Sequence, residues 1–297
     1  LRLSGQGLMS HTASTTVSRY FEKTRGKALS VTWLGLSAAE FVLPILIVSL
    51  LTITSWRNIW ISISILVLIF LPLTSFILIK KLKLDSRENS IEDLVSENSN
   101  IKQWSRSEVL KDYRFYIISL NMLSLPSIAT GVFVYQSFIL TSKNWGPYIM
   151  AQSFMVYSVL SVITLSISGF LIDKYSSRKL LIFMNIPLFM SAIILHSFNS
   201  PYSSFIFLGL IGISNGFANV LGSSTWAEIY GVKYIGSIKA LTSGLMVFAT
   251  AVGTAVFGIL IDYGYTINSI AVFSAIYIAI IVILLFFFRK KIEPTYI

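Results

Sequence analysis

The stretch Lys80–Arg114 reads KKLKLDSRENSIEDLVSENSNIKQWSRSEVLKDYR and holds 15 of the chain's 36 charged residues. Three long apolar runs precede it and six follow it. A helix that crosses a membrane needs about 20 consecutive, mostly apolar residues, and each of these runs is long enough. The sequence therefore indicates two blocks of membrane helices joined by a charged linker.

The composition of the chain supports this class. Only 12% of its 297 residues are charged and its mean hydropathy is +0.75, whereas a soluble domain has about 25% charged residues. We predict an all-α, polytopic membrane protein. The net charge of +10 would also suit a nucleic-acid binder, but loop cations that face the cytoplasm account for it, and we expect no nucleic-acid partner. Cysteine is absent, which excludes disulfides and thiolate metal sites from this sequence.

The apolar runs predict nine membrane spans. They are Leu1–Ser18, Ala28–Thr54, Ile59–Ile79, Phe115–Leu140, Tyr148–Ile172, Leu180–Phe198, Phe205–Ile229, Ala240–Ile261 and Ile267–Phe288. The sequence begins inside the first of them, without the pattern of a signal peptide. We therefore expect further N-terminal helices in the complete protein.

The connections between these spans alternate in charge. One set, which includes Lys80–Arg114 and the segment after Phe288, holds 20 of the 23 Lys and Arg, and the opposite set holds Arg2, Arg57 and Lys143. The positive-inside rule then places the linker and the C-terminus in the cytoplasm and the start of the chain outside. We expect a plasma membrane, and a bacterial inner membrane in particular. The expected domains are the end of an N-terminal bundle (1–79), a cytoplasmic linker (80–114), a six-helix bundle (115–288) and a cytoplasmic tail (289–297).

Polar side chains recur on one face of every third span. In the first, fourth and seventh spans they are Ser4, His11, Thr15 and Ser18, then Asn121, Ser124, Gly131 and Tyr135, then Asn215, Asn219, Ser223 and Trp226. Polar residues inside a membrane usually face a bundle interior or a wet cavity. We predict that these three spans line a cavity and that the more apolar third, sixth and ninth spans face lipid.

Individual polar residues of these stripes are candidates for the substrate or proton pathway. The candidates are His11, Asn121, Tyr135, Gln136, Asn215 and Asn219. The alternative for each is a hydrogen bond that bridges two helices, worth about 0.6–2 kcal/mol. Close helix packing is predicted at four glycines, which are not candidates for a chemical role: Gly212, Gly216, Gly253 and Gly258.

Glu40 lies in the middle of the second span. A carboxylate at that depth costs about 2.5–3.5 kcal/mol on insertion scales, and such residues are usually functional. Because desolvation favours the neutral carboxyl, Glu40 is a candidate for binding a proton. The alternative is a hydrogen-bonded Glu that closes helix packing beside Pro44. Arg2 is a candidate for attracting an anionic substrate or assisting proton coupling, and its alternative is an arginine that reaches the outer surface.

A loop motif follows the fifth span. It reads Gly169-Phe-Leu-Ile-Asp173-Lys174-Tyr-Ser-Ser-Arg178 and resembles the G-x-x-x-D-R/K-x-x-x-R signature of the major facilitator superfamily. The start of the chain, RLSGQG, is similar to that family's fourth-helix pattern, and the nearest branch is that of bacterial monocarboxylate and oxalate:formate carriers. The resemblance implies helices four to twelve of twelve, alternating access, and a cytoplasmic gate at Gly169, Asp173, Lys174 and Arg178. The alternative is a plain positive-inside loop.

The resemblance to the carboxylate carriers has one departure. Those carriers have an arginine four residues before the glycine that matches Gly169, and this sequence has Leu165 there. The resemblance to the superfamily therefore implies a transporter, but the arginine that those carriers have for a carboxylate substrate is absent from this sequence.

The predicted function is secondary active transport of a small polar metabolite, which includes an organic anion as one option, coupled to protons or another ion. The alternatives are an exporter of drugs or amphiphiles with the same fold, or a membrane sensor that transports nothing. We expect no enzymatic activity, no cofactor and no metal site, because the sequence has no P-loop, no H-E-x-x-H motif and only two histidines. The expected partners are the substrate, the coupling ion and the lipid bilayer, with the protein as a monomer.

Overall fold

The computed structural model describes residues 25–81 and 102–296 and consists, in these ranges, of helices and their connections. The helices are α2 (Arg25–Leu51), α3 (Trp56–Lys81), α5 (Arg106–Val109), α6 (Tyr113–Val134), α7 (Gln136–Lys143), α8 (Pro147–Tyr175), α9 (Ser177–Ser197), α10 (Ser203–Tyr230), α11 (Ile235–Asp262) and α12 (Ile267–Phe288). Eight of them are long and apolar enough to cross a membrane. The first predicted span, Leu1–Ser18, lies outside the described residues.

Local sequence determines where the helices begin. Asp112 precedes α6 and its side chain accepts from the Arg114 backbone N–H, while Thr266 precedes α12 and accepts from the Ser269 N–H. Both contacts satisfy a donor that the first turn leaves free. Pro147 occupies the first position of α8, where its missing N–H costs no helical bond. α12 has the predicted limits because no glycine or proline interrupts its apolar run.

The prediction of one span over Phe115–Leu140 is wrong at its C-terminal part. The helix ends at Val134, Tyr135 has non-helical dihedrals, and a separate short helix, α7, follows. The 22 residues of α6 already suffice to cross a membrane. Residues Gln136–Lys143 lie beyond that length, so nothing requires them to continue the same helix.

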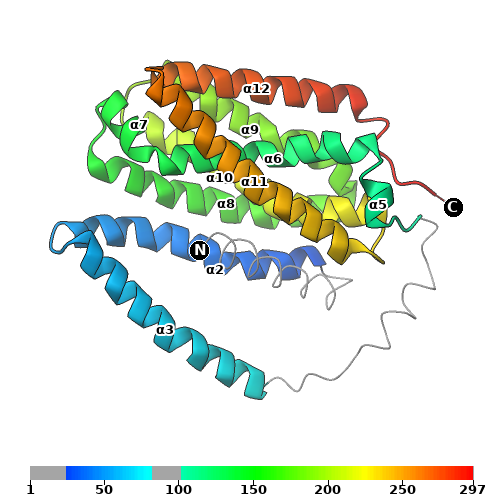
Figure 1. Cartoon of the computed structure of the whole chain (residues 1–297), viewed down its shortest axis with the longest axis horizontal. Helices are drawn as coiled ribbons and strands as arrows, with labels where there is room; N and C mark the ends of the chain where they lie inside the picture. Colours follow the sequence, from blue (N-terminus) through cyan, green and yellow to red (C-terminus); the bar gives the residue numbers. More distant parts are fainter. Residues whose placement is uncertain (1–24, 82–101, 297) are drawn as a thin grey trace.

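Close contacts between backbones hold the main bundle together. α10 packs between α8 and α9, α6 packs against α11, and α12 packs against α9 (Figure 1). A Cβ added at Gly212 would clash with the backbone of Tyr157, and one at Gly253 would clash with the backbone of Ser127. The prediction that these glycines permit close helix packing is therefore confirmed.

The first two described helices lie at the edge of this bundle. α2 packs along α8, whereas α3 contacts α2 and diverges from the rest (Figure 1). Most apolar side chains of α3 are exposed, among them Leu68, and α12 exposes a row that includes Phe287. These exposed apolar faces agree with the expected contact of the third and ninth spans with lipid.

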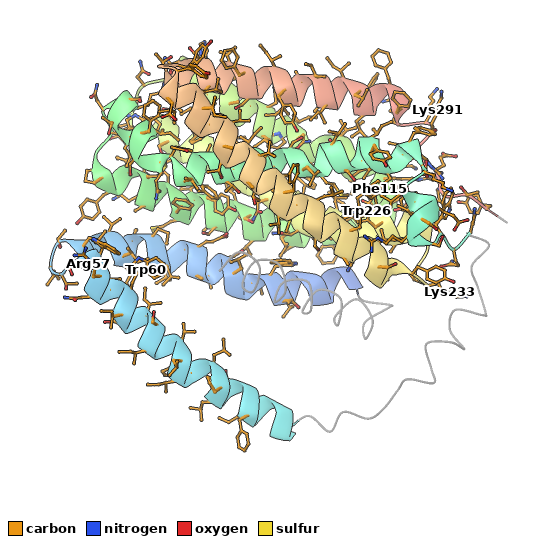
Figure 2. The ribbon with its side chains drawn as sticks, in the orientation of Figure 1. Arg57, Trp60, Phe115, Trp226, Lys233 and Lys291 are labelled. Atoms are coloured by element: carbon orange, nitrogen blue, oxygen red, sulfur yellow. The ribbon has the colours of Figure 1, made fainter. Side chains whose placement is uncertain are left out.

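The charged residues gather at the two ends of the helices. Lys233 and Lys291 lie at the end where α5 and the C-terminal segment meet, and Arg57 lies at the opposite end (Figure 2). We call the first the linker end and the second the far end. At the linker end Phe115 and Trp226 pack with their ring centroids 5.4 Å apart (Figure 2) and form part of a buried apolar cluster.

Candidate functional site

Glu228, in the last turn of α10, organises the turn between α8 and α9. Its carboxylate accepts hydrogen bonds from the Ser176 hydroxyl at 2.5 Å, from the Ser177 backbone N–H at 2.9 Å and from the Ser177 hydroxyl at 2.5 Å. Ser176 has φ 81°, a value that side-chain-bearing residues rarely adopt. Ser176, Ser177, Arg178 and Glu228 are called the Glu228 cluster below.

Arg178 connects this cluster to the C-terminal segment. Its Nε lies 3.3 Å from Glu228 Oε1, and its Nη1 lies 3.4 Å from Glu293 Oε1. Neither contact has the alignment of a hydrogen bond, so both are ion pairs held by proximity. The side chains of Arg178 and Glu228 are 21% and 25% exposed, and that of Glu293 is 63% exposed. Water therefore reaches the pair with Glu293 more readily and weakens it.

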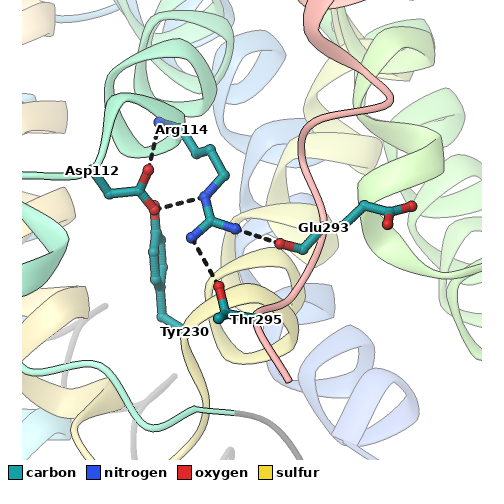
Figure 3. A network of polar contacts seen from close by, with 5 residues as sticks. All are labelled: Asp112, Arg114, Tyr230, Glu293 and Thr295. Atoms are coloured by element: carbon teal, nitrogen blue, oxygen red, sulfur yellow. Dashed lines mark hydrogen bonds and ion pairs between the residues drawn. The ribbon is translucent and has the colours of Figure 1, made fainter. Parts of the chain in front are cut away.

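A second polar group at the linker end surrounds Arg114 (Figure 3). Asp112 Oδ2 accepts from Arg114 Nε at 2.7 Å and from the Tyr230 hydroxyl at 3.1 Å. The guanidinium also donates to the Glu293 carbonyl oxygen at 2.5 Å and to the Thr295 hydroxyl at 3.2 Å. Asp112 and Arg114 are both buried, so each charge depends on the other for compensation. These five residues are called the Arg114 network.

The linker residues next to this network are fixed by their own contacts. Ser105 and Glu108 form a reciprocal cap on α5. The hydrogen bond from Lys102, followed by those from the Ser105 backbone and hydroxyl, lowers the pKa of Glu108 from 4.5 to about 2. A pocket of about 440 Å³ opens here. It is lined by Trp104, Glu108, Lys111, Asp112, Tyr113, Arg114 and Thr295.

The four predicted gate residues have different positions. Gly169 is buried within α8, and Asp173 and Lys174 lie in its last turn. Lys174 is exposed, with Nζ 5.1 Å from the centroid of the Tyr175 ring. Among the described side chains of the four predicted gate residues, Arg178 is therefore the one that enters the Glu228 cluster.

Glu40 faces the bundle from α2. Its carboxyl group forms a hydrogen bond with the hydroxyl of Tyr157 on α8, and Tyr157 is buried among aromatic side chains that include Phe133. The second carboxyl oxygen of Glu40 is buried without a hydrogen-bond partner. Ser37, one turn earlier on the same helix, is also buried. The candidate proton-binding residue therefore lies where the segment before the linker meets the bundle after it.

The predicted cavity residues lie mostly in contacts between helices. Asn121 is fully buried and donates to the Leu181 carbonyl oxygen at 3.1 Å. Asn215 donates to the Ser161 hydroxyl at 3.0 Å, and Asn219 is half-buried. The remaining described candidates are Tyr135, which stacks on Phe257, and Gln136, which is exposed at the start of α7. Arg2 and His11 lie outside the described residues.

Lys143 holds the far end of the bundle. Its Nζ donates to the Phe198 carbonyl oxygen at 3.1 Å and to Oδ1 of both Asn199 and Asn268 at 2.7 Å. Phe198 and Asn199 follow α9, and Asn268 lies in the first turn of α12. Burial lowers the pKa of Lys143. The positive-inside analysis assigned this lysine to the side with few cations, and the contacts show that it joins the end of α7 to the end of α9 and the start of α12.

The sequence analysis did not identify Glu228 and Glu293, the acids at the linker end, as site residues. Glu228 is the next-to-last residue of the predicted span Phe205–Ile229, where an acid is typical of a helix end exposed to solvent. Glu293 lies in a segment that reads as a tail. In the part of the chain that the structure describes, no group of three His, Cys, Asp or Glu side chains could hold a metal ion.

Comparison with known proteins yields one family. A sequence model described as the Major Facilitator Superfamily matches residues 4–237 and, in a second match, residues 144–296. A search of curated proteins found no match. The family matches cover far more than half of the chain and agree with its many apolar helices. The chain therefore belongs to the Major Facilitator Superfamily, a family of membrane transporters.

Proposed function

We propose that the protein is a secondary active transporter that moves a small polar metabolite by alternating access. The linker end is its cytoplasmic gate, in a plasma membrane with the linker and the C-terminus inside. The observation that carries the proposal is the Glu228 cluster, in which one acid on α10 gathers the α8–α9 turn and its arginine. Contacts between partly exposed charges are weak enough to be broken and remade, as a gate requires.

Coupling to protons is assigned to Glu40. A buried carboxyl group with one unpartnered oxygen is costly when ionised, and the hydrogen bond to Tyr157 links it to α8. A proton taken up from one side therefore changes the contact between α2 and the bundle. The variant Glu40→Gln should flatten the pH dependence of transport, and an unchanged pH profile at normal expression would exclude this role.

The substrate class is narrowed by Leu165. This residue is 1% exposed, in the place where the similar carboxylate carriers have an arginine. This position therefore has no positive charge that could bind a carboxylate. Within the monocarboxylate-like branch, we favour a neutral or zwitterionic polar metabolite over a simple carboxylate as the substrate.

The experiment starts with a thermal-shift screen of small polar metabolites on the purified chain at two pH values, because a ligand that binds the folded state raises its midpoint. Flux of the best ligand is then measured in proteoliposomes. Arg178→Gln and Glu228→Gln should each lower flux by about tenfold, the equivalent of ~1.4 kcal/mol. Lys179→Gln, on the exposed neighbour of Arg178, is the matched control and should leave flux unchanged.

Two other functions have distinct outcomes in the same system. A drug exporter would expel a fluorescent amphiphilic dye from cells and ignore polar metabolites. A membrane sensor would bind its ligand without moving it into liposomes. Equal flux in the Arg178, Glu228 and Lys179 variants would contradict the gate.

A further inference from the structure

The residues after α12 fold back onto the bundle. Ile292 is 2% exposed and packs in the apolar cluster that contains Val109, Phe115 and Trp226. The segment 289–296 crosses the linker end beside the start of α6 (Figure 3). A buried isoleucine fixes the segment, since releasing it would return apolar surface to water. We call residues 289–296 the strap.

The strap binds the linker side of this end through its backbone and one hydroxyl. Arg114 donates to the Glu293 carbonyl oxygen at 2.5 Å and to the Thr295 hydroxyl at 3.2 Å. The Lys102 backbone N–H donates to the Thr295 carbonyl oxygen at 2.8 Å. Hydrogen bonds from a buried charged group are stronger than neutral ones, so these bonds fix the position of the strap at the linker end.

The linker residues that follow Lys102 contact the end of α10. The Trp104 backbone N–H donates to the Tyr230 carbonyl oxygen at 3.0 Å. Gln103 approaches Gly231, whose φ is 81° and where a Cβ would collide with the Gln103 side chain. The strap, the linker residues and the end of α10 thus form one continuous set of contacts.

Glu293 extends this set to the opposite side. While its backbone carbonyl binds Arg114, its carboxylate lies 3.4 Å from Arg178 in the Glu228 cluster. One strap residue therefore contacts two arginines on two different elements. Arg178 in turn divides its charge between Glu228 and Glu293.

We propose that the strap is part of the gate, and that Glu293 is a positioning residue that holds Arg178 in the Glu228 cluster when the linker end is closed. The proposal rests on the proposed function, because it assumes that this end opens. Opening then requires the carboxylate of Glu293 to release Arg178, while Ile292 and the Arg114 network keep the strap on the bundle. No covalent bond changes in this step.

A single cysteine can report the opening, because the chain has none of its own. Met184 is fully buried in an apolar cluster with Leu180 and Leu221, beneath the Glu228 cluster. The variant Met184→Cys is made in the full chain, placed in lipid nanodiscs and labelled with a water-soluble maleimide. Its rate of labelling measures how often water reaches this position from the linker end.

Glu293→Gln should raise the labelling rate by about two- to fivefold, the range that an exposed ion pair can supply. Added salt should raise the rate less in Glu293→Gln than in the parent, because screening and the substitution remove the same attraction. Glu293→Asp should restore part of the parent rate. The matched control is Tyr296→Phe, on an exposed side chain of the strap, which should keep the parent rate and salt response. Unchanged gel filtration and thermal midpoints show that the variants are folded.

Different outcomes contradict the proposed role of the strap and the proposed gate. If Glu293→Gln leaves both the rate and the salt response unchanged while Arg178→Gln raises the rate, the gate stands and the strap is excluded from it. If Arg178→Gln also leaves the rate unchanged, the gate itself is wrong. An equal increase in Tyr296→Phe would show a general loosening and would also overturn the role of Glu293.

Discussion

Asn185 of α9 donates its side-chain amide to two oxygens of Asn121 on α6, to the backbone carbonyl oxygen at 2.8 Å and to Oδ1 at 2.9 Å. Both residues are fully buried. A residue whose polarity predicted a place in a substrate cavity is thus engaged in joining two helices, with a further bond from Asn121 to Leu181.

Replacing Asn121 by alanine should therefore lower stability. The bonds it loses lie between helices, where one bond contributes about 0.6–1.7 kcal/mol. The measurement is the thermal midpoint of the purified protein in detergent. Asn219→Ala, a half-buried asparagine on α10, should shift the midpoint less, and an equal shift in the two variants would contradict the assignment.

Gly212→Ala should prevent the close contact between α10 and α8. Its new methyl group would overlap the backbone of Tyr157, which cannot give way as a flexible side chain can. Overpacking of this kind costs about 1–3 kcal/mol, and the yield of folded protein should fall. Gly222→Ala on the same helix meets nothing within 4 Å, so its folded yield should equal or exceed that of the parent.

Asp112→Ala should be among the most destabilising single changes at the linker end. It leaves the buried guanidinium of Arg114 without its counter-charge, a loss of about 3–5 kcal/mol. The thermal midpoint measures it, with Lys102→Met as the control. The pair between Lys102 and Glu108 is 40% and 41% exposed, so that control should behave nearly as the parent. Similar losses in both variants would show that burial does not strengthen the Arg114 network.

Lys143 gives a dependence of stability on alkaline pH. Because burial lowers its pKa below the ordinary 10.5, the unfolded chain keeps the proton more often than the folded chain between the lowered value and 10.5. The contribution of Lys143 to the free energy of unfolding therefore rises with pH across that window. Denaturant titrations of the parent and of Lys143→Met should show a difference that grows with pH there.

At neutral pH the same variant tests the contacts. Lys143→Met leaves Oδ1 of Asn199 and of Asn268 without their donor, which costs about 1–3 kcal/mol for each group that stays unsatisfied. Stability equal to the parent at neutral pH, or a difference that does not change with pH, would remove Lys143 from this role.

The fold could be predicted from hydropathy to the extent that lipid determines it. α12 has the predicted limits because an uninterrupted apolar run must become a helix in a membrane. The glycines of α10 and α11 could be predicted as packing positions because small residues permit close backbones. The break at Tyr135 could not, since no proline or glycine marks it and the apolar run continues through Leu140.

The site could be predicted only where a local motif marks it. Arg178 follows from the loop pattern after α8, but its partner Glu228 lies 50 residues later in the sequence, and nothing in the spacing joins them. Glu293 is further away still, between the buried residues Ile292 and Pro294 of a segment that is otherwise polar and partly exposed. Partners of this kind are chosen by the tertiary packing of helix ends, which the composition of a span does not encode.

The unusual backbone conformation of Ser176 places strain in the turn between α8 and α9. A residue with a side chain at φ 81° and ψ 141° stores about 1–3 kcal/mol, and Glu228 balances this cost through its bonds to the two serines. The turn is therefore strained, and the hydrogen bonds that offset the strain come from Glu228 on a different helix. In the proposed gate, breaking these bonds would let the Ser176 backbone relax into an ordinary conformation, so the strain would favour opening of the linker end and oppose its closing.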